Sequence, residues 1–239
     1  MRKIIAISFV LLVSTCMQAQ FFNKNSKGNK HEIKTTRNTS DYNDISVLGS
    51  FDVLLVKGTE GTLKIQIEEN LLPYLITEVS RGKLSIRWKK NSNIHSRKRV
   101  KIKIPIQSIE NISLIGSGNI STDEILKEDT LNISITGSGA IKLTVETSLT
   151  KVKITGSGNI QLEGNSRQLK CTLAGSGDFS GGNFKCENVH VSVVGSGDAS
   201  VFVSQQLNAS IAGSGELTYY GHPTMEKINV VGSGEVRMQ

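Results

Sequence analysis

The chain has 239 residues and carries 28 Lys and Arg against 21 Asp and Glu, which gives a net charge of +7 at neutral pH. Hydrophobic residues make up 37% and aromatic residues only 5%, whereas glycine occurs 23 times. Three prolines are too few for a disordered linker protein, and the composition predicts a folded chain whose core is built from small and β-branched side chains.

The first residues have the pattern of an export signal. Two basic residues precede the apolar run 4–13, which is too short to cross a bilayer, and Ala19 is a small residue suited to cleavage. We therefore predict a signal peptide over residues 1–19 and a location in the periplasm, at the outer membrane surface or outside the cell. An alternative interprets "VSTC" as a lipobox with a lipid anchor on Cys16, although Thr15 fits that motif poorly.

The next segments lead into a region of alternating strands. Residues 20–42 are polar, basic and without a pattern, which predicts a flexible leader. Residues 43–110 contain four segments with period-two alternation, "ISVLGSFDVLLV", "TLKIQIEE", "KLSIRWKK" and "RVKIKIPI". Their larger side chains suit an N-terminal β cap with degenerate coils, because a solenoid needs its exposed end covered.

Basic residues concentrate at the end of that region. Seven Lys and Arg lie between Lys89 and Lys103. The simpler interpretation is a solvated hairpin with basic faces, and the alternative is a patch for acidic glycan or anionic lipid headgroups. Nucleic acid is not expected as a partner, because the chain is exported and only Trp88 is interleaved with the charges.

From residue 111 to the C-terminus the triplet Gly-Ser-Gly occurs seven times at intervals of 18 to 21 residues. Such a sustained period is typical of a solenoid. The first glycines of the triplets are Gly116, Gly137, Gly156, Gly175, Gly195, Gly213 and Gly232.

Within each repeat, apolar residues occupy positions four and two before the first glycine and four after it, all of one parity. This alternation predicts β-strands with one buried face. Both glycines share the inward parity, so the backbone is expected to turn there, with the serine facing outward. The chain is therefore predicted to be all-β, a right-handed parallel β-helix of about 19-residue coils, with one domain over 43–239 and seven coils over 111–239.

Cysteine is scarce. After removal of the signal peptide only Cys171 and Cys186 remain, an even number that permits a disulfide in an oxidising compartment. Cys171 occupies an inward slot of the repeat, where a buried free thiol is the commoner outcome, and we favour two free thiols.

These residues also resemble a known family. The opening "ISVLGSFDVLLVKG", the segments "IEEN" and "GKLSIRW", the strand "VKIKIPI" and the serial "GSGN" and "GSGD" triplets are similar to the auto-transporter adhesins with a head GIN domain, exported proteins common among Bacteroidetes. The resemblance covers residues 43–239. It implies a β-helical, extracytoplasmic protein and supplies no catalytic residues.

Each catalytic template fails in this sequence. The triplets place serine directly between glycines, unlike a G-x-S-x-G elbow, and no triplet continues into the Lys-Ser or Lys-Thr of a P-loop. The four histidines are scattered without metal-ligand spacing. The coils are short and lack the long insertions that would wall a polysaccharide cleft, so we expect no enzyme and no cofactor.

The polar feature most specific to the repeat lies just outside each corner, where parity directs serines and Asn, Asp or Glu outward. Its members form the candidate interaction face: Ser117, Asn119, Ser138, Ser157, Asn159, Ser176, Asp178, Ser196, Asp198, Ser214, Glu216, Ser233 and Glu235. The simpler interpretation of the Asn, Asp and Glu row is turn chemistry beside glycine. A weak Ca²⁺ site at Asp178 and Asp198 is the functional alternative.

The leading functional hypothesis is a non-enzymatic, exported adhesin or surface-interaction module whose partner is a glycan or another cell-surface polymer. The first alternative is a periplasmic scaffold without an external ligand, and the second is a carbohydrate-active β-helix enzyme. Neither a membrane span nor a particular oligomeric state is predicted.

Overall fold

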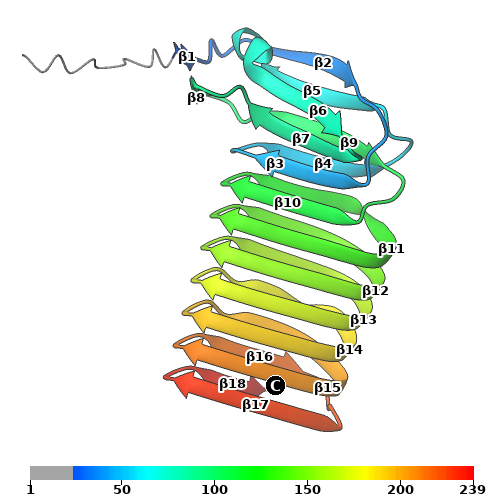
Figure 1. Cartoon of the computed structure of the whole chain (residues 1–239), viewed down its shortest axis with the longest axis vertical. Helices are drawn as coiled ribbons and strands as arrows, with labels where there is room; N and C mark the ends of the chain where they lie inside the picture. The colour runs from blue at the N-terminus through cyan, green and yellow to red at the C-terminus, as the bar shows by residue number, and fades with distance from the viewer. Residues whose placement is uncertain (1–23) are drawn as a thin grey trace, which may run out of the picture.

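A computed structural model describes residues 24–239. The chain forms a right-handed, all-β parallel solenoid whose coils stack along one axis, from the N-terminal cap to the C-terminal coil (Figure 1). The predicted fold class is therefore confirmed. The predicted signal peptide and the alternative anchor at Cys16 lie outside the described residues.

Each coil of the body is nearly one continuous strand that runs from one Gly-Ser-Gly corner to the next. Adjacent strands pair in parallel and in register, so that Val152 lies beside Cys171 and Ile154 beside Leu173. The strands are β10 Asn111–Gly116, β11 Asn119–Gly137, β12 Ala140–Gly156, β13 Asn159–Gly175, β14 Phe179–Gly195, β15 Ala199–Gly213, β16 Glu216–Tyr220, β17 Met225–Gly232 and β18 Glu235–Met238.

The core consists of ladders of inward side chains from successive coils. Ile133, Ile135 and Leu173 are at most 1% exposed, and such ladders are apolar because each coil covers the next at a spacing of about 4.8 Å. Cys171 and Cys186 are free and buried. Burial raises the pKa of the Cys186 thiol to about 12, against a smaller opposing effect of a hydrogen bond from the backbone of Ser166.

The corners show why both glycines are needed. The first glycine of every triplet has positive φ, for example 126° at Gly175, a conformation that glycine adopts without strain. At the second glycine the coils approach too closely for a side chain. A Cβ on Gly197 would lie 2.1 Å from the carbonyl oxygen of Gly177 in the preceding coil.

The N-terminal cap begins with one further coil that has the same plan. Strands β3 (Asp44–Leu48) and β4 (Asp52–Lys57) pair in parallel with β10 and β11. Phe51 replaces the second glycine of this corner. Its ring fits because the coil above opens into a wide loop, and Trp88 packs against it with ring centroids 5.1 Å apart.

Above that coil the chain direction reverses. Strands β7 and β9 stack in parallel on β3 and β4, whereas β6 and β5 then pair antiparallel with β7 and β9. The direction changes between β4 and β5, where Gly61 has positive φ, and changes back between β6 and β7 at Arg81 and Gly82, which also have positive φ. The bounds are β5 Thr62–Glu68, η1 Glu69–Tyr74, β6 Leu75–Ser80, β7 Lys83–Trp88 and β9 Lys101–Ile106.

Two strands lie within the segment predicted to be a flexible leader, so that prediction is wrong for residues 24–38. Strand β2 (Glu32–Asn38) pairs antiparallel with β5, and β1 (Lys24–Lys27) pairs in parallel with β8 (Ser92–His95). The sequence lacked an apolar alternation here because β2 covers the end of the core. Its inward Arg37 donates hydrogen bonds to the carbonyl oxygens of Leu72 and Leu75 at 2.9 and 2.6 Å.

The C-terminal end of the solenoid has no such cover within residues 24–239. Every residue of β17 is exposed, including the inward-facing Ile228 and Val230 at 42% and 37%. Among residues 24–239 as a whole, no helix is long and apolar enough to cross a membrane.

Candidate interaction surfaces

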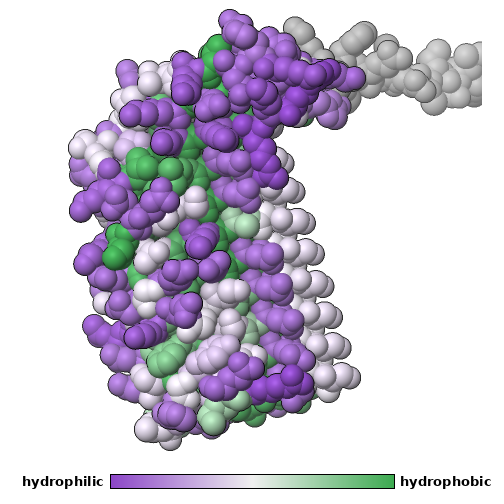
Figure 2. Space-filling view, turned by 180° about the vertical axis from the view of Figure 1, so that it is seen from behind, coloured by the Kyte–Doolittle hydropathy of each residue, from purple (hydrophilic) through white to green (hydrophobic). Residues whose placement is uncertain are grey.

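The corner residues predicted as an interaction face do lie together on one exposed edge. All thirteen side chains of that face are exposed, and the parallel register stacks them coil upon coil. Seen from behind, the corners form a pale ridge of small residues along one side of the solenoid (Figure 2). The geometry of the edge therefore follows the predicted parity.

The Asn and Asp side chains of this edge form hydrogen bonds that connect successive coils. The side-chain oxygen of Asn159 accepts the backbone N–H of Asp178 at 3.2 Å, and Asp178 in turn accepts that of Asp198 at 3.1 Å. Asp198 accepts the N–H of Glu216 at 2.8 Å. Each oxygen thus caps the next coil, which is the turn chemistry expected beside glycine.

A metal site on this edge gains no further support. Asp178 and Asp198 each use one carboxylate oxygen for the next coil. Across residues 24–239 no group of three or more His, Cys, Asp or Glu side chains is arranged to hold a metal ion. Calcium binding at these two residues stays a prediction that only a titration can test.

The basic segment is divided between two environments. Lys98 and Arg99 form ion pairs with Glu32 at 2.8 Å and with Asp52 at 3.0 Å. Lys101 and Lys103 instead project outward from β9, exposed on the face that β9 shares with β5 and β2. The segment is therefore neither a simple hairpin nor one continuous patch.

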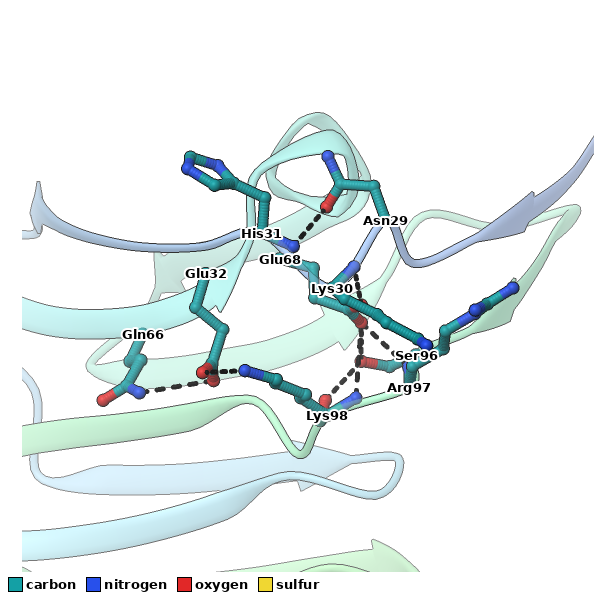
Figure 3. A network of polar contacts seen from close by, with 9 residues as sticks. All are labelled: Asn29, Lys30, His31, Glu32, Gln66, Glu68, Ser96, Arg97 and Lys98. Atoms are coloured by element: carbon teal, nitrogen blue, oxygen red, sulfur yellow. Dashed lines mark hydrogen bonds and ion pairs between the residues drawn. The ribbon is translucent and has the colours of Figure 1, made fainter.

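One buried carboxylate holds the cap loops in place (Figure 3). Glu68, 1% exposed, accepts hydrogen bonds from the backbone N–H of Lys30 at 2.7 Å and of Arg97 at 2.8 Å, and from the hydroxyl of Ser96 at 2.9 Å. Burial raises the pKa of Glu68, but the hydrogen bonds from Arg97, Lys30, Ser96 and Lys98 outweigh it, and the net pKa is lowered. The carboxylate therefore joins the start of β2 to the loop before β9.

A groove of about 500 Å³ crosses the outer surface of β13 to β16. Its lining includes the bulge at Gly182 and Asn183, where the register of β14 and β15 shifts by several residues. Phe202 and Tyr220 also line it; they are paired side by side on adjacent strands and are half-buried. Its remaining lining is Gln161, Leu162, Glu163, Ser180 and Ser200.

Tyr220 depends on a glycine for its place in this groove. A Cβ on Gly182 would lie 2.9 Å from the ring of Tyr220, so a larger residue would displace the ring. Within 111–239 the aromatic residues other than Phe202 and Tyr220 are buried. The two aromatic residues of the coils that remain partly exposed therefore both lie in the groove.

The sequence reasoning did not identify this groove. Phe202 and Tyr220 each stand at outward parity seven residues after the first glycine of their corner, beyond the positions that the corner-based alignment covers. A search for aromatic residues at outward positions would have found the pair. The bulge that makes the wall has no comparable signal.

Comparison with known proteins agrees with the architecture. The family model described as "Putative auto-transporter adhesin, head GIN domain" matches residues 41–223. A crystal structure from Bacteroides fragilis, named a "putative adhesin", is 22% identical with a TM-score of 0.85, and the similarity covers 90% of this chain and 100% of that one.

Two further crystal structures share the fold over 90% of this chain. One, named a "Putative lipid binding protein", comes from Parabacteroides distasonis, is 26% identical with a TM-score of 0.76, and is covered completely. The other, an adhesin by its name, comes from Parabacteroides merdae, is 21% identical with a TM-score of 0.72, and is covered to 99%.

Curated protein sequences give no significant match to the chain. The family match extends over more than half of the chain and spans the cap strands from β3 onward as well as the coils as far as β16. This match shows that the chain belongs to the family described as "Putative auto-transporter adhesin, head GIN domain".

Proposed function

We propose that the chain is a non-enzymatic adhesion module of the bacterial cell envelope that binds a surface glycan in the groove beside Phe202 and Tyr220. The observation that carries this proposal is the pair of half-buried aromatic rings at the edge of a groove lined by amides, hydroxyls and one carboxylate. The corner edge, which sequence reasoning favoured, offers small side chains whose acceptors already serve the coils.

The chemistry of the groove suits a sugar. A pyranose ring presents a C–H face that can pack on an aromatic side chain, while its hydroxyls both donate and accept hydrogen bonds. Gln161 and Glu163, whose side chains are joined by a hydrogen bond of 3.0 Å, lie in the same groove as the rings. Glu163 also faces Lys142 at 3.8 Å, so the groove carries no unbalanced charge there.

The groove also has the shape for a polymer. It extends over four stacked strands and is open to solvent, so it can accept a segment of a longer chain. The family description and two of the three structural neighbours concern adhesins, which supports a role in surface interaction.

The test is a glycan array followed by calorimetry with the best oligosaccharide. We expect Tyr220→Ala to weaken binding at least tenfold, because a stacked ring contributes on the order of 1 kcal/mol or more beyond its area. Val194→Ala is the matched control, since Val194 is an apolar residue 54% exposed outside the groove. Equal binding by the wild-type and Tyr220→Ala proteins would contradict the proposal.

A second candidate, the periplasmic scaffold, is favoured by one observation. The exposed β17 edge can pair with another chain. Analytical ultracentrifugation over a range of concentrations tests it: end-to-end assembly that Val230→Lys abolishes would support a scaffold, and a monomer at all concentrations would exclude this route.

A further inference from the structure

A second surface, on the cap, concentrates positive charge in a shallow groove. Lys34 of β2, Lys64 of β5, and Lys101 and Lys103 of β9 line a groove of about 740 Å³ on one face of these three strands. All four lysines are exposed. The cap end of the solenoid is correspondingly hydrophilic when seen from behind (Figure 2).

The strand register brings these charges close together. Lys64 and Lys103 lie directly opposite each other in the antiparallel pair of β5 and β9. Lys34 and Lys101 flank Gln66 in the neighbouring row. Like charges directly opposite each other destabilise a sheet, so this arrangement costs the cap stability instead of contributing to it.

The acidic groups at the border do not neutralise the groove. Glu32 pairs with Lys98, and the pKa of Glu32 is lowered chiefly by that hydrogen bond and least by the charge of Lys101. Asp52, opposite Lys101 in the register, pairs with Arg99. Among residues 24–239 none of the four lysines lies within 4.0 Å of a carboxylate oxygen.

We propose that this lysine groove is a second binding site, separate from the aromatic groove, which takes an acidic polysaccharide with carboxylate or sulfate groups along its chain. Lysine side chains act as point charges for such groups and need no fixed orientation. Two rows of lysines on a twisted sheet, about 7 Å apart along the strands, suit repeated charges of one polymer.

An anionic membrane is the less suitable partner. Binding to a bilayer scales with buried apolar area in addition to charge, and the residues lining this groove include no exposed large hydrophobic side chain. The four lysines line a groove on one face of the sheet, and this shape suits a polymer strand better than a flat headgroup layer.

The test compares two lysine pairs with the same spacing. Lys101→Gln with Lys103→Gln removes two charges from the groove, and Lys151→Gln with Lys153→Gln removes two exposed charges from β12, outside it. Binding of the purified protein to heparin and to polygalacturonate is measured by calorimetry at low and at physiological salt. We expect the groove variant to bind about tenfold more weakly or worse, and the β12 variant to bind as the wild type does.

Several outcomes would overturn the proposal. It fails if neither polymer binds, if both variants lose affinity equally, or if raising the salt leaves affinity unchanged, because exposed charges are screened. It also fails if vesicles of phosphatidylcholine and phosphatidylglycerol bind with the same affinity and the same dependence on the groove lysines. In that case the site belongs to a membrane.

Folding and the proposed function are controlled separately. Lys64→Gln removes one of the two opposed charges, so its melting temperature should equal or exceed that of the wild type while its affinity for heparin falls. A lower melting temperature would contradict the like-charge argument. Tyr220→Ala should leave heparin binding intact, so the two sites can fail independently.

Discussion

The two ends of the solenoid differ in how the apolar core is covered. At the N-terminal end the chain reverses, adds antiparallel strands and covers the core with Arg37 and the loops around Glu68. At the C-terminal end no strand of residues 24–239 covers β17, and its inward residues are exposed. The family match includes the cap strands from β3 onward, but neither β1 and β2 at one end nor β17 and β18 at the other.

This difference teaches that stability in a stacked fold depends on neighbours on both sides. Ile112 and Ile228 occupy the same slot of the repeat, yet they are 1% and 42% exposed. The same residue in the same local structure therefore contributes unequally. Changes that are matched in chemistry but placed at different coils make the comparison quantitative.

The largest effect is expected at the corners. Gly197→Ala places a Cβ 2.1 Å from the carbonyl oxygen of Gly177 between two complete coils, and we expect a loss of about 3 kcal/mol or more in the free energy of unfolding. Gly234→Ala makes a similar contact in the last coil, where the added Cβ would lie 2.5 Å from the carbonyl oxygen of Gly215. There only the terminal strands should detach, so urea titration should show a much smaller loss.

The control for both variants is Ser196→Ala, because this serine lies within the same triplet and is exposed. It should change the stability by less than about 0.5 kcal/mol. If Gly197→Ala were equally mild, the close approach of the corners would not limit the sequence.

The next largest loss of stability is expected at the inward position four residues before the corner, compared between two coils. Ile133→Ala creates a cavity in a fully buried ladder and should cost about 3 kcal/mol, whereas Ile228→Ala should cost about 1 kcal/mol. Chemical denaturation at low protein concentration measures both. A cost at Ile228 that rises with protein concentration would mean that another molecule covers the open end.

An effect smaller than that of Ile133→Ala is expected at the cap, where Glu68→Gln keeps the shape of the side chain but removes its charge. The loss of charge-assisted hydrogen bonds should cost about 2 kcal/mol near neutral pH. Because the pKa of Glu68 is lowered on folding, its contribution is present above the unfolded pKa of about 4.3 and is lost as the pH falls through the folded value.

Thermal melts between pH 7 and pH 3 test this linkage. The wild type should lose more stability than the Glu68→Gln protein below about pH 4.5. Parallel curves for the two proteins would show that the carboxylate is ionised equally in both states and would remove its role in fixing the cap.

The coils could be predicted from the sequence because one local rule repeats in them. Inward parity at Ile133, Ile154 and Leu173 and glycine at each corner specify strand, register and bend together. The exposed edge with Asp178 and Asp198 followed from the same parity. The fold class and the free thiols needed no further information.

The cap and the grooves were harder to predict from the sequence because their residues are determined by contacts between segments far apart in the chain. Strand β2 has a polar inward Arg37, which makes sense only against the carbonyl oxygens of η1 and β6. Tyr220 has a place only because Gly182, two coils away, leaves room for it. The lysine groove combines β2, β5 and β9, whose pairing depends on a reversal that no repeat announces.

The stacked corners determine the distance between the two ends of the solenoid. Every coil between the cap and β17 presents the same backbone oxygens to the next, as the contacts of Gly195 with Gly175 and of Gly213 with Gly195 illustrate. A coil can thus be inserted or removed without altering either end, and each one shifts the C-terminal end by about 4.8 Å relative to the cap. The repeat works as a ruler with a fixed step, so the number of coils determines how far apart the two ends are held.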